Sequence, residues 1–213
     1  MVLLAICVGA SPAMADGTES DGSLVVNTAE PQETDPADTG VVDIPADKVN
    51  VEPDIPSSGG DHSKNEPDRV DCNVYNYYTP SYKGGDHHKG VGPKLGNTNN
   101  TSHTATSKFT SEVTGSVGVS ISGSLAVSVE AMIAKIEAKY DVTLSASMTA
   151  KLGNEMSVPT PAHKTTHAAY GVYRLRNQGT SWRQLESCKT TPKVTVTSYT
   201  PDYVGWYIWE TNA

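Results

Sequence analysis

The chain has 213 residues, 37% of them hydrophobic, and a formal net charge of −8 that is unevenly distributed. Residues 16–69 hold 14 Asp and Glu against 3 Lys and Arg, a net charge of −11, whereas residues 70–213 hold 10 against 13, a net charge of +3. A net charge of +3 gives no indication of nucleic-acid binding, so we expect no nucleic-acid partner.

The first 15 residues have the pattern of a secretory signal peptide. An apolar run precedes Pro12, and the small residues Ala13 and Ala15 flank Met14. The run is too short to span a bilayer, and the pattern predicts cleavage after Ala15. A lipid anchor on Cys7 is the alternative interpretation. We therefore expect a secreted, extracellular protein of bacterial origin.

Two cysteines remain once residues 1–15 are removed. An exported chain meets oxidising conditions, and the spacing of Cys72 and Cys188 does not resemble a metal site. The sequence therefore predicts a disulfide that ties the start of the folded part to its end. A pair of free thiols is the alternative.

Residues 16–69 form an acidic leader with six prolines and no aromatic residue. Such a composition does not bury enough apolar surface to offset the entropy of ordering, so we predict that the leader is disordered. It would act as a solubilising spacer or as a pro-segment that shields the rest of the chain.

Residues 70–213 are expected to form one β-rich domain. An aromatic strand is predicted over 71–78, followed by a long loop from Pro80 to Asn100 that is rich in Gly, Asn, Lys and His. Residues 112–130 then alternate between apolar and small polar side chains. Residues 142–158 alternate with the opposite parity.

A short amphipathic helix is predicted between these two alternating runs. Met132, Ile133, Ile136 and Tyr140 are spaced one, three and four residues apart, with Ala, Lys and Glu between them. This spacing places the four side chains on one face of about three helical turns.

Further strands are predicted over 168–175, 182–185, 193–199 and 203–209, with a turn at Pro201–Asp202. The expected fold is therefore mainly β. It would be an antiparallel sheet, a sandwich or an elongated β domain with one short amphipathic helix, preceded by the disordered leader.

The two alternating runs are longer than ordinary globular strands, which typically have five or six residues. A transmembrane β-strand needs roughly 9 to 11 residues with one apolar and one polar face. The polar faces here carry mostly Ser and Thr. Paired together, the runs from Glu112 to Val158 would form a hairpin with Met132, Ile133, Ile136 and Tyr140 at its tip.

Residues 104–176 resemble the aerolysin-like pore-forming proteins of the epsilon-toxin and mosquitocidal-toxin branch. The resemblance rests on the alternating Ser/Thr-rich runs, the amphipathic segment between them, the proline-containing exit over 157–163 and the strand over 170–173. It implies a hairpin that leaves the soluble form and assembles with other copies into a membrane-spanning oligomer. Membrane lipid and further copies of the chain are then the expected partners.

An ordinary secreted β-sandwich is the alternative structure. In this interpretation Gly115, Gly118 and Gly123 mark bulges that split the first run into two strands. The apolar face then packs on a core beneath the short helix.

The aromatic residues near the C-terminus suggest the alternative function. Tyr203, Trp206, Tyr207 and Trp209 would either pack in the core or form an exposed surface. An exposed set would bind a cell-surface glycan or a membrane interface, as in a secreted, non-catalytic binding module.

No catalytic motif, phosphate-binding loop or cofactor motif is present in the sequence, so we expect neither an enzyme nor a cofactor. His87 and His88 are adjacent, and His163 and His167 are four residues apart. Because these residues lie in predicted loops or strands, we expect solvated histidines and no metal site.

Overall fold

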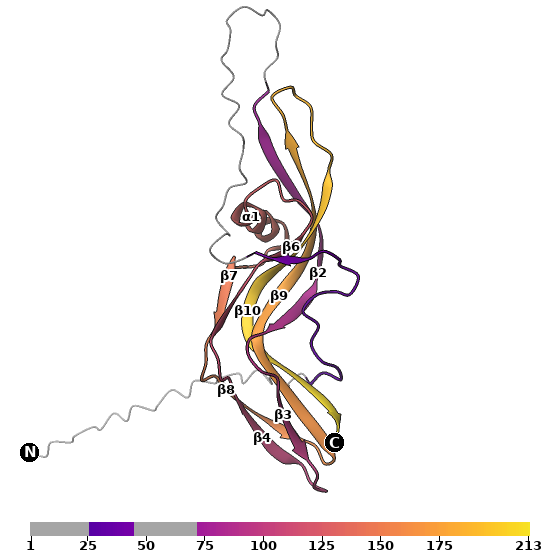
Figure 1. Cartoon of the computed structure of the whole chain (residues 1–213), viewed down its shortest axis with the longest axis vertical. Coiled ribbons are helices and arrows are strands. Elements are labelled where there is room, and N and C mark those ends of the chain that lie inside the picture. Colours follow the sequence, from indigo (N-terminus) through magenta and orange to yellow (C-terminus); the bar gives the residue numbers. More distant parts are fainter. Residues whose placement is uncertain (1–25, 45–71) are drawn as a thin grey trace, which may run out of the picture.

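The computed structural model describes residues 26–44 and 72–213. Figure 1 shows an elongated molecule built along two long strands, with the only helix of the described part beside their upper half. The predicted signal peptide lies outside the described residues, as do residues 16–25 and 45–69 of the predicted leader.

The main sheet is antiparallel, which confirms the mainly β fold class. Its strands lie in the order β1, β6, β10, β9 and β2, and β3 pairs with β9 below the end of β2. The bounds of these six strands are β1 (Val42–Asp43), β2 (Tyr75–Gly90), β3 (Leu95–Asn99), β6 (Ser120–Ser122), β9 (Lys164–Gln184) and β10 (Val194–Asn212).

The last two strands are longer than the sequence predicted. β9 and β10 pair from Val194 opposite Ser181 to Asn212 opposite Lys164. The predicted turn at Pro201–Asp202 is wrong, because the chain continues through this point with only a shift of register between Pro201 and Tyr203. A bulge absorbs the extra residue and bends the strand without reversing it.

The predicted loop from Pro80 to Asn100 is also wrong, since most of it belongs to β2 and β3. Its backbone pairs with β9, while many of its polar side chains remain exposed. The close approach of β2 to β9 depends on Gly171, because a Cβ at this position would collide with the Lys89 carbonyl.

The two alternating runs are divided into short strands. The bounds are β4 (Ala105–Thr110), β5 (Gly115–Gly118), β7 (Ser147–Ala150) and β8 (Glu155–Thr160). β4 pairs with β8, and β5 pairs with β7. β5 and β6 are separate strands in different sheets, as the β-sandwich interpretation predicted from the glycines.

The predicted helix is confirmed as α1 (Val129–Tyr140). Ser128 caps its N-terminus by accepting a hydrogen bond from the backbone N–H of Ala131, at 3.2 Å. Its C-terminus ends at Asp141, which has a left-handed conformation with φ of 52°. Glu130 in the first turn and Lys139 in the last turn complement the helix dipole.

Three groups of buried apolar side chains hold the layers together. One lies between α1 and the upper part of the main sheet and includes Met132, Ile136, Leu175 and Val196. The other two lie between the lower part of the sheet and the β4–β8 and β5–β7 pairs. The helix and the hairpin strands therefore form a second layer over a single long sheet.

The predicted disulfide is confirmed between Cys72 and Cys188, with an S–S distance of 2.00 Å. It joins positions 116 residues apart in the sequence. The bridge closes the end of the sheet where β2 begins and β9 ends.

Residues 26–44, which we call the strap, differ from the predicted disordered leader. The strap runs along the main sheet, drawn in indigo in Figure 1, and ends in β1. Asn27 bridges to Trp209 at the lower end of β10, and Val42 pairs with Ile121 in β6. Hydrogen bonds and ion pairs with distant residues order this acidic segment, although it is poor in apolar side chains.

Candidate functional site

The four short strands β4, β5, β7 and β8 form one hairpin, which we define as residues 105–160. Ala105 lies opposite Thr160 and Gly118 lies opposite Ser147. The same number of residues separates 105 from 118 and 147 from 160, so neither side gains a residue between the two strand pairs. The hairpin therefore keeps one register along its whole paired length.

Hydrogen bonds continue across the gap between the two strand pairs. The Ser111 N–H donates to the Asn154 carbonyl at 2.9 Å, and the Gly153 N–H donates to the Ser111 carbonyl at 2.8 Å. The Leu152 N–H donates to the Thr114 hydroxyl at 3.0 Å. The strands thus remain associated where regular pairing is interrupted.

One face of the hairpin is apolar and packs on the sheet, and the other is polar. Phe109, Val117, Ala150 and Val158 are buried against the sheet. On the polar face the hydroxyls of Ser116 and Thr149 lie 2.8 Å apart and are exposed. The apolar and polar faces predicted from the alternation are therefore present in the hairpin.

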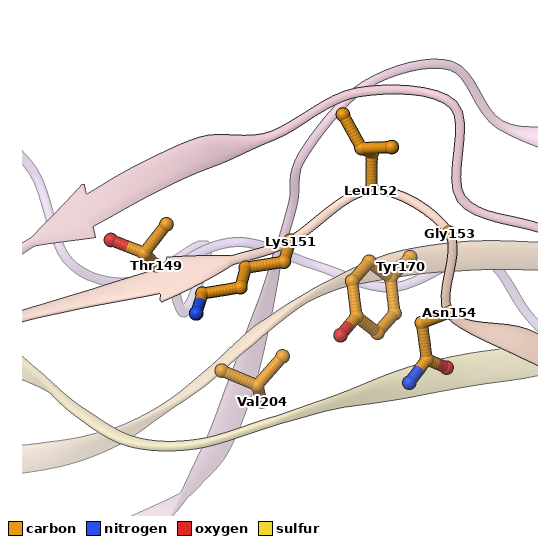
Figure 2. Close-up of a pocket in the computed structure, with 7 residues that line it drawn as sticks. All are labelled: Thr149, Lys151, Leu152, Gly153, Asn154, Tyr170 and Val204. Carbon is orange, nitrogen blue, oxygen red and sulfur yellow. The ribbon is translucent and has the colours of Figure 1, made fainter.

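A shallow pocket lies at the middle of the hairpin, where it stands off the sheet. In Figure 2 the side chains of Tyr170 and Val204 come from the sheet, and Leu152 points away from it. The Trp206 indole N–H donates to the Asn154 side-chain oxygen across this region, at 2.7 Å. This hydrogen bond adds to the apolar packing of Ala150 and Val117 on Tyr170 and Val172 in the same part of the hairpin.

The residues predicted to form the hairpin tip lie on α1 and face the sheet. Met132 and Ile136 have no exposed surface and Ile133 is 6% exposed, while Tyr140 is half-buried beside them. The Glu137 carboxylate accepts a hydrogen bond from the Leu144 N–H at 2.8 Å and fixes the segment that follows α1. The structure thus brings the four residues together within the core.

β6 connects the first half of the hairpin to the main sheet. It has only three residues, and it pairs with β10 on one side and with β1 of the strap on the other. The Ile44 N–H also donates to the Val119 carbonyl at 2.8 Å. The strap therefore covers the outer edge of this short strand.

Asp43 is the main polar contact between the strap and the residues around β6. Its carboxylate accepts hydrogen bonds from the Ser120 hydroxyl and the Lys89 ammonium. Burial by itself would raise the pKa of Asp43, but these two bonds and the charges of Lys89 and Arg174 hold it below its usual value. The carboxylate is therefore ionised in its place on the sheet.

A second carboxylate of the strap lies on Arg176. Both Asp38 oxygens accept hydrogen bonds from this guanidinium, at 2.7 Å each, and the Tyr199 hydroxyl donates to the same carboxylate. The hydrogen bonds from Arg176 lower the pKa of Asp38. A bidentate pair of this kind fixes both the position and the orientation of the strap.

Arg174 is buried beneath the strap and is only 1% exposed. It donates to the Ser120 hydroxyl at 2.6 Å and to the Glu33 carbonyl at 2.5 Å, and it lies 3.8 Å from Asp43. We use the name arginine site for Arg174, Arg176, Lys89, Tyr199 and Ser120 together.

The aromatic residues predicted as a binding surface lie on two sides of β10. Trp206 packs against hairpin residues, whereas the Tyr207 hydroxyl donates to the Ala29 carbonyl of the strap at 3.3 Å. Tyr203 is 46% exposed, and Trp209 is only 5% exposed. The four residues therefore do not form a single surface.

A different set of rings forms a continuous strip beside the arginine site. Tyr203 stacks on Tyr173 with 4.6 Å between ring centroids, and His88 lies 4.8 Å from Tyr173 and 5.6 Å from Tyr207. Trp209 continues the strip toward the lower end of the sheet. We call these five residues the aromatic strip.

His88 is the titratable group at the centre of this strip. Burial lowers its pKa to about 4, and the nearby charge of Arg174 acts in the same direction, against the hydrogen bond to the Gly205 carbonyl. That bond joins Nε2 to the carbonyl at 3.2 Å, so Nε2 carries the proton. The Nδ1 atom has no hydrogen-bond partner among the described residues.

Because the pKa of His88 is lowered, the protein is expected to become less stable as the pH is lowered from 6.5 to about 4. In this range the unfolded chain binds a proton that the folded protein excludes, so the free energy of unfolding decreases by up to about 1.4 kcal/mol per pH unit. Denaturant midpoints measured across this range should show the decrease. Asp38 and Asp43 act at lower pH, below the usual carboxyl value of 3.8, because their pKa values are lowered.

His88→Asn is the control for this pH dependence, since an amide donates to Gly205 without titrating. Its stability should change much less between pH 6.5 and 4. An equal pH dependence in the two proteins would show that another group is responsible.

Sequence reasoning did not identify the residues of the arginine site. Arg174 and Arg176 alternate along a strand, and this pattern alone is typical of a solvated face. The one available signal was the contrast between an acidic leader and a mildly basic domain. That contrast indicated attraction between the two parts but not the residues involved.

Among residues 26–44 and 72–213, no group of three or more His, Cys, Asp or Glu side chains is placed to hold a metal ion. No helix in these ranges is long and apolar enough to cross a membrane. In comparisons with known proteins, no family model matches this chain and no curated protein matches its sequence.

Proposed function

We propose that this protein is secreted and perturbs membranes by extending its hairpin through the segment that now forms β6 and α1. The observation that supports the proposal is the unchanged register of the hairpin from Ala105 opposite Thr160 to Gly118 opposite Ser147. A hairpin with a fixed register can add residue pairs beyond Gly118 and Ser147 without changing any existing pair.

Continuing this register pairs apolar residues with apolar residues. Val119 would lie opposite Ala146, Ile121 opposite Leu144, and Val129 opposite Ile136. The positions between them pair polar residues, such as Ser120 with Ser145, Ser122 with Thr143 and Glu130 with Lys135. The extended hairpin would therefore have one apolar face and one polar face along its whole length.

The chain would reverse direction at Met132 and Ile133 in this register. These residues are at the leading end of the extended hairpin, with Ile136 close behind them, and Tyr140 lies opposite Leu125. The residues that fill the core beneath α1 are thus the residues that would enter lipid first.

The extended segments have the length and chemistry that lipid requires. Residues 119–131 and 134–146 each exceed the roughly 9 to 11 residues of a membrane-crossing strand. Backbone groups in lipid must all be hydrogen-bonded, and a closed ring of strands is the β arrangement that satisfies them. Several copies would therefore assemble, each contributing one hairpin, and no catalytic step is needed.

The soluble form holds this segment by few strand pairs. β6 has three residues and β5 and β7 have four each, while residues 123–127 and 142–146 lie outside strands. Local opening is easiest where pairing is short. The strap would have to leave Ser120 before β6 could separate from the sheet.

Fluorescent labels on two adjacent positions of α1 test the proposal. Ala134 and Lys135 are both exposed in the soluble structure. In the extended hairpin position 134 would face lipid and position 135 the aqueous side. We expect an environment-sensitive dye on A134C to shift to the blue with liposomes that leak, whereas the same dye on K135C should change little. Both variants carry Cys7→Ser so that the dye reacts at one position.

The leakage measurement uses vesicles of neutral and of anionic lipids, each with an enclosed dye, at pH 7.5 and 5.5. Release of the dye together with the difference between positions 134 and 135 would support the extended hairpin. Absence of release under all four conditions would contradict membrane perturbation. Equal shifts at the two positions would contradict the proposed register.

A binding module on a cell surface is the second candidate function. The exposed part of the aromatic strip favours it, because Tyr203 is 46% exposed and stacks on Tyr173. Paired rings of this kind bind the apolar faces of sugars. Such a module would bind glycan without releasing dye from vesicles.

A further inference from the structure

We propose that the arginine site binds an acidic glycan, and that the strap occupies this site in the structure as an internal substitute for the ligand. The proposal concerns the side of the sheet that the strap covers and does not require the hairpin to extend. It deepens the binding role suggested by the aromatic strip.

The strap contacts the arginine site mainly through charged and polar groups. Residues 26–44 contain five acidic residues and no Lys or Arg. Asp38 lies on Arg176, Asp43 lies on Lys89, and Glu33 lies 3.9 Å from Lys89. Two of the apolar residues of the strap, Val26 and Val42, are 38% and 65% exposed. Charged contacts therefore hold the strap on the arginine site, beside the apolar packing of Ile44 against the core.

The cations are held in position by the sheet itself. Arg174 donates to Ser120 and lies 5.4 Å from the centre of the Tyr199 ring. Arg176 lies 5.7 Å from the centre of the Tyr82 ring. These contacts come from strands of the main sheet and do not depend on the strap, so the site is preformed.

The strap supplies the anionic and carbonyl groups that contact the cations of the arginine site. Arg174 is 1% exposed, and its Nε atom has no hydrogen-bond partner among the described residues. Because Arg174 is buried beneath the strap, displacement of the strap exposes this guanidinium and removes its contacts with Glu33 and Asp43. A ligand that displaces the strap therefore has to supply anionic groups of its own to replace these contacts.

The positions of the two strap carboxylates indicate a chain-like ligand. Asp38 defines one anion position at Arg176 and Tyr199, and Asp43 defines another at Lys89, Ser120 and Arg174. The strap runs along the sheet between its two ends, as Figure 1 shows. A linear polymer with repeated carboxylate or sulfate groups matches this arrangement.

The aromatic strip indicates that the ligand has sugar rings between its acidic groups. The strap contacts the arginine site through the hydrogen bond from Arg174 to the Glu33 carbonyl. Tyr207 already contacts the strap through its hydroxyl. Guanidinium groups bind carboxylate or sulfate, and aromatic faces bind sugar rings, so an acidic glycan uses both halves of the surface.

Replacing two aspartates of the strap by asparagine in the full-length chain tests the proposal. D38N/D43N removes the carboxylates that occupy the site but leaves the strap in the protein. Because an internal competitor lowers the apparent affinity of a ligand, its weakening should tighten binding of a heparin-derived oligosaccharide about tenfold relative to wild type. Titration calorimetry at fixed salt measures this change, and higher salt should reduce it.

E112Q/E186Q is the matched control, since it changes the net charge equally at exposed positions outside both the strap and the arginine site. It should bind the oligosaccharide like wild type. Adding Arg176→Gln to D38N/D43N should remove the gain, because the guanidinium that binds the anion is lost. A gain of equal size in E112Q/E186Q, or no gain in D38N/D43N, would overturn the proposal.

Sedimentation with anionic vesicles distinguishes the ligand from lipid. If D38N/D43N gains affinity for the vesicles but not for the oligosaccharide, the site binds lipid headgroups and the glycan proposal is wrong. An S122C/T197C disulfide, which would hold β6 on β10, should leave binding of the oligosaccharide unchanged even though it should prevent release of dye. These experiments therefore test the glycan proposal and the membrane proposal separately.

Discussion

Liposome leakage is expected to disappear when an S122C/T197C disulfide ties β6 to β10. Ser122 and Thr197 are paired residues in adjacent antiparallel strands. Such pairs have Cα atoms about 4.5 to 5.5 Å apart, which is within the range that a disulfide spans. The bridge leaves the soluble fold intact but prevents β6 from joining the extended hairpin, so the oxidised protein should release no dye.

A second disulfide provides the matched control. Ser116 and Thr149 face each other across β5 and β7, with their hydroxyls 2.8 Å apart, and both are exposed. In the proposed extension this pair does not change, so oxidised S116C/T149C should release dye as well as wild type does. The comparison therefore tests which strands separate and which remain together.

Reduction should restore leakage in S122C/T197C. The reductant also acts on Cys72–Cys188, so the reference is wild type treated in the same way. If oxidised S122C/T197C leaks normally, β6 does not need to leave the sheet. If S116C/T149C is blocked as well, the two strands of the hairpin separate and the unchanged register has no mechanistic role.

Ile136→Asp is expected to prevent folding of the soluble protein. Ile136 has no exposed surface and packs between α1 and the main sheet. A carboxylate at this position loses its hydration without gaining a partner, and we expect a destabilisation on the order of 5 kcal/mol. That is comparable to the whole stability of many domains, so little soluble, disulfide-bonded protein should be recovered.

Lys135→Asp is the control on the neighbouring position of the same helix. Lys135 is exposed, so this variant should fold and unfold at a denaturant concentration close to that of wild type. Near-ultraviolet circular dichroism and a denaturant titration measure both variants. Normal stability of Ile136→Asp would contradict the packing of α1 on the sheet.

This expectation changes how the hairpin tip can be tested. Loss of leakage in Ile136→Asp would follow from misfolding alone and would not identify a residue that enters lipid. Labels on the exposed positions 134 and 135 and the disulfide at positions 122 and 197 avoid this ambiguity. They leave the buried face of α1 unchanged.

The sequence by itself determined the local features of this protein. The amphipathic spacing of Met132, Ile133 and Ile136 determined a helix, because the period of 3.6 residues is a property of neighbouring positions. The alternation around it determined two faces for the hairpin. Cys72 and Cys188 were paired correctly because they are the two cysteines outside the predicted signal peptide.

Glycine also gave correct local information. The alternating run from Glu112 to Glu130 suggested a single long strand, and the glycines at 115, 118 and 123 suggested its division. The structure contains β5 and β6 as separate strands, with β5 beginning at Gly115 and ending at Gly118. Glycine in a strand often marks a point where the strand is interrupted, so these strand boundaries could be predicted from the sequence.

Only the tertiary structure decided the roles of β2 and the strap. Residues 80–90 have the composition of a loop, yet they form a strand because β9 offers backbone partners beside them, with two shifts of register. The strap is acidic and proline-rich, yet Asp38 is held by Arg176, 138 residues further along the chain. Strand pairing and ion pairing join residues that are distant in the sequence. The local sequence of either segment does not indicate which distant residues it pairs with. Helix periodicity and strand alternation, in contrast, can be recognised within a single segment.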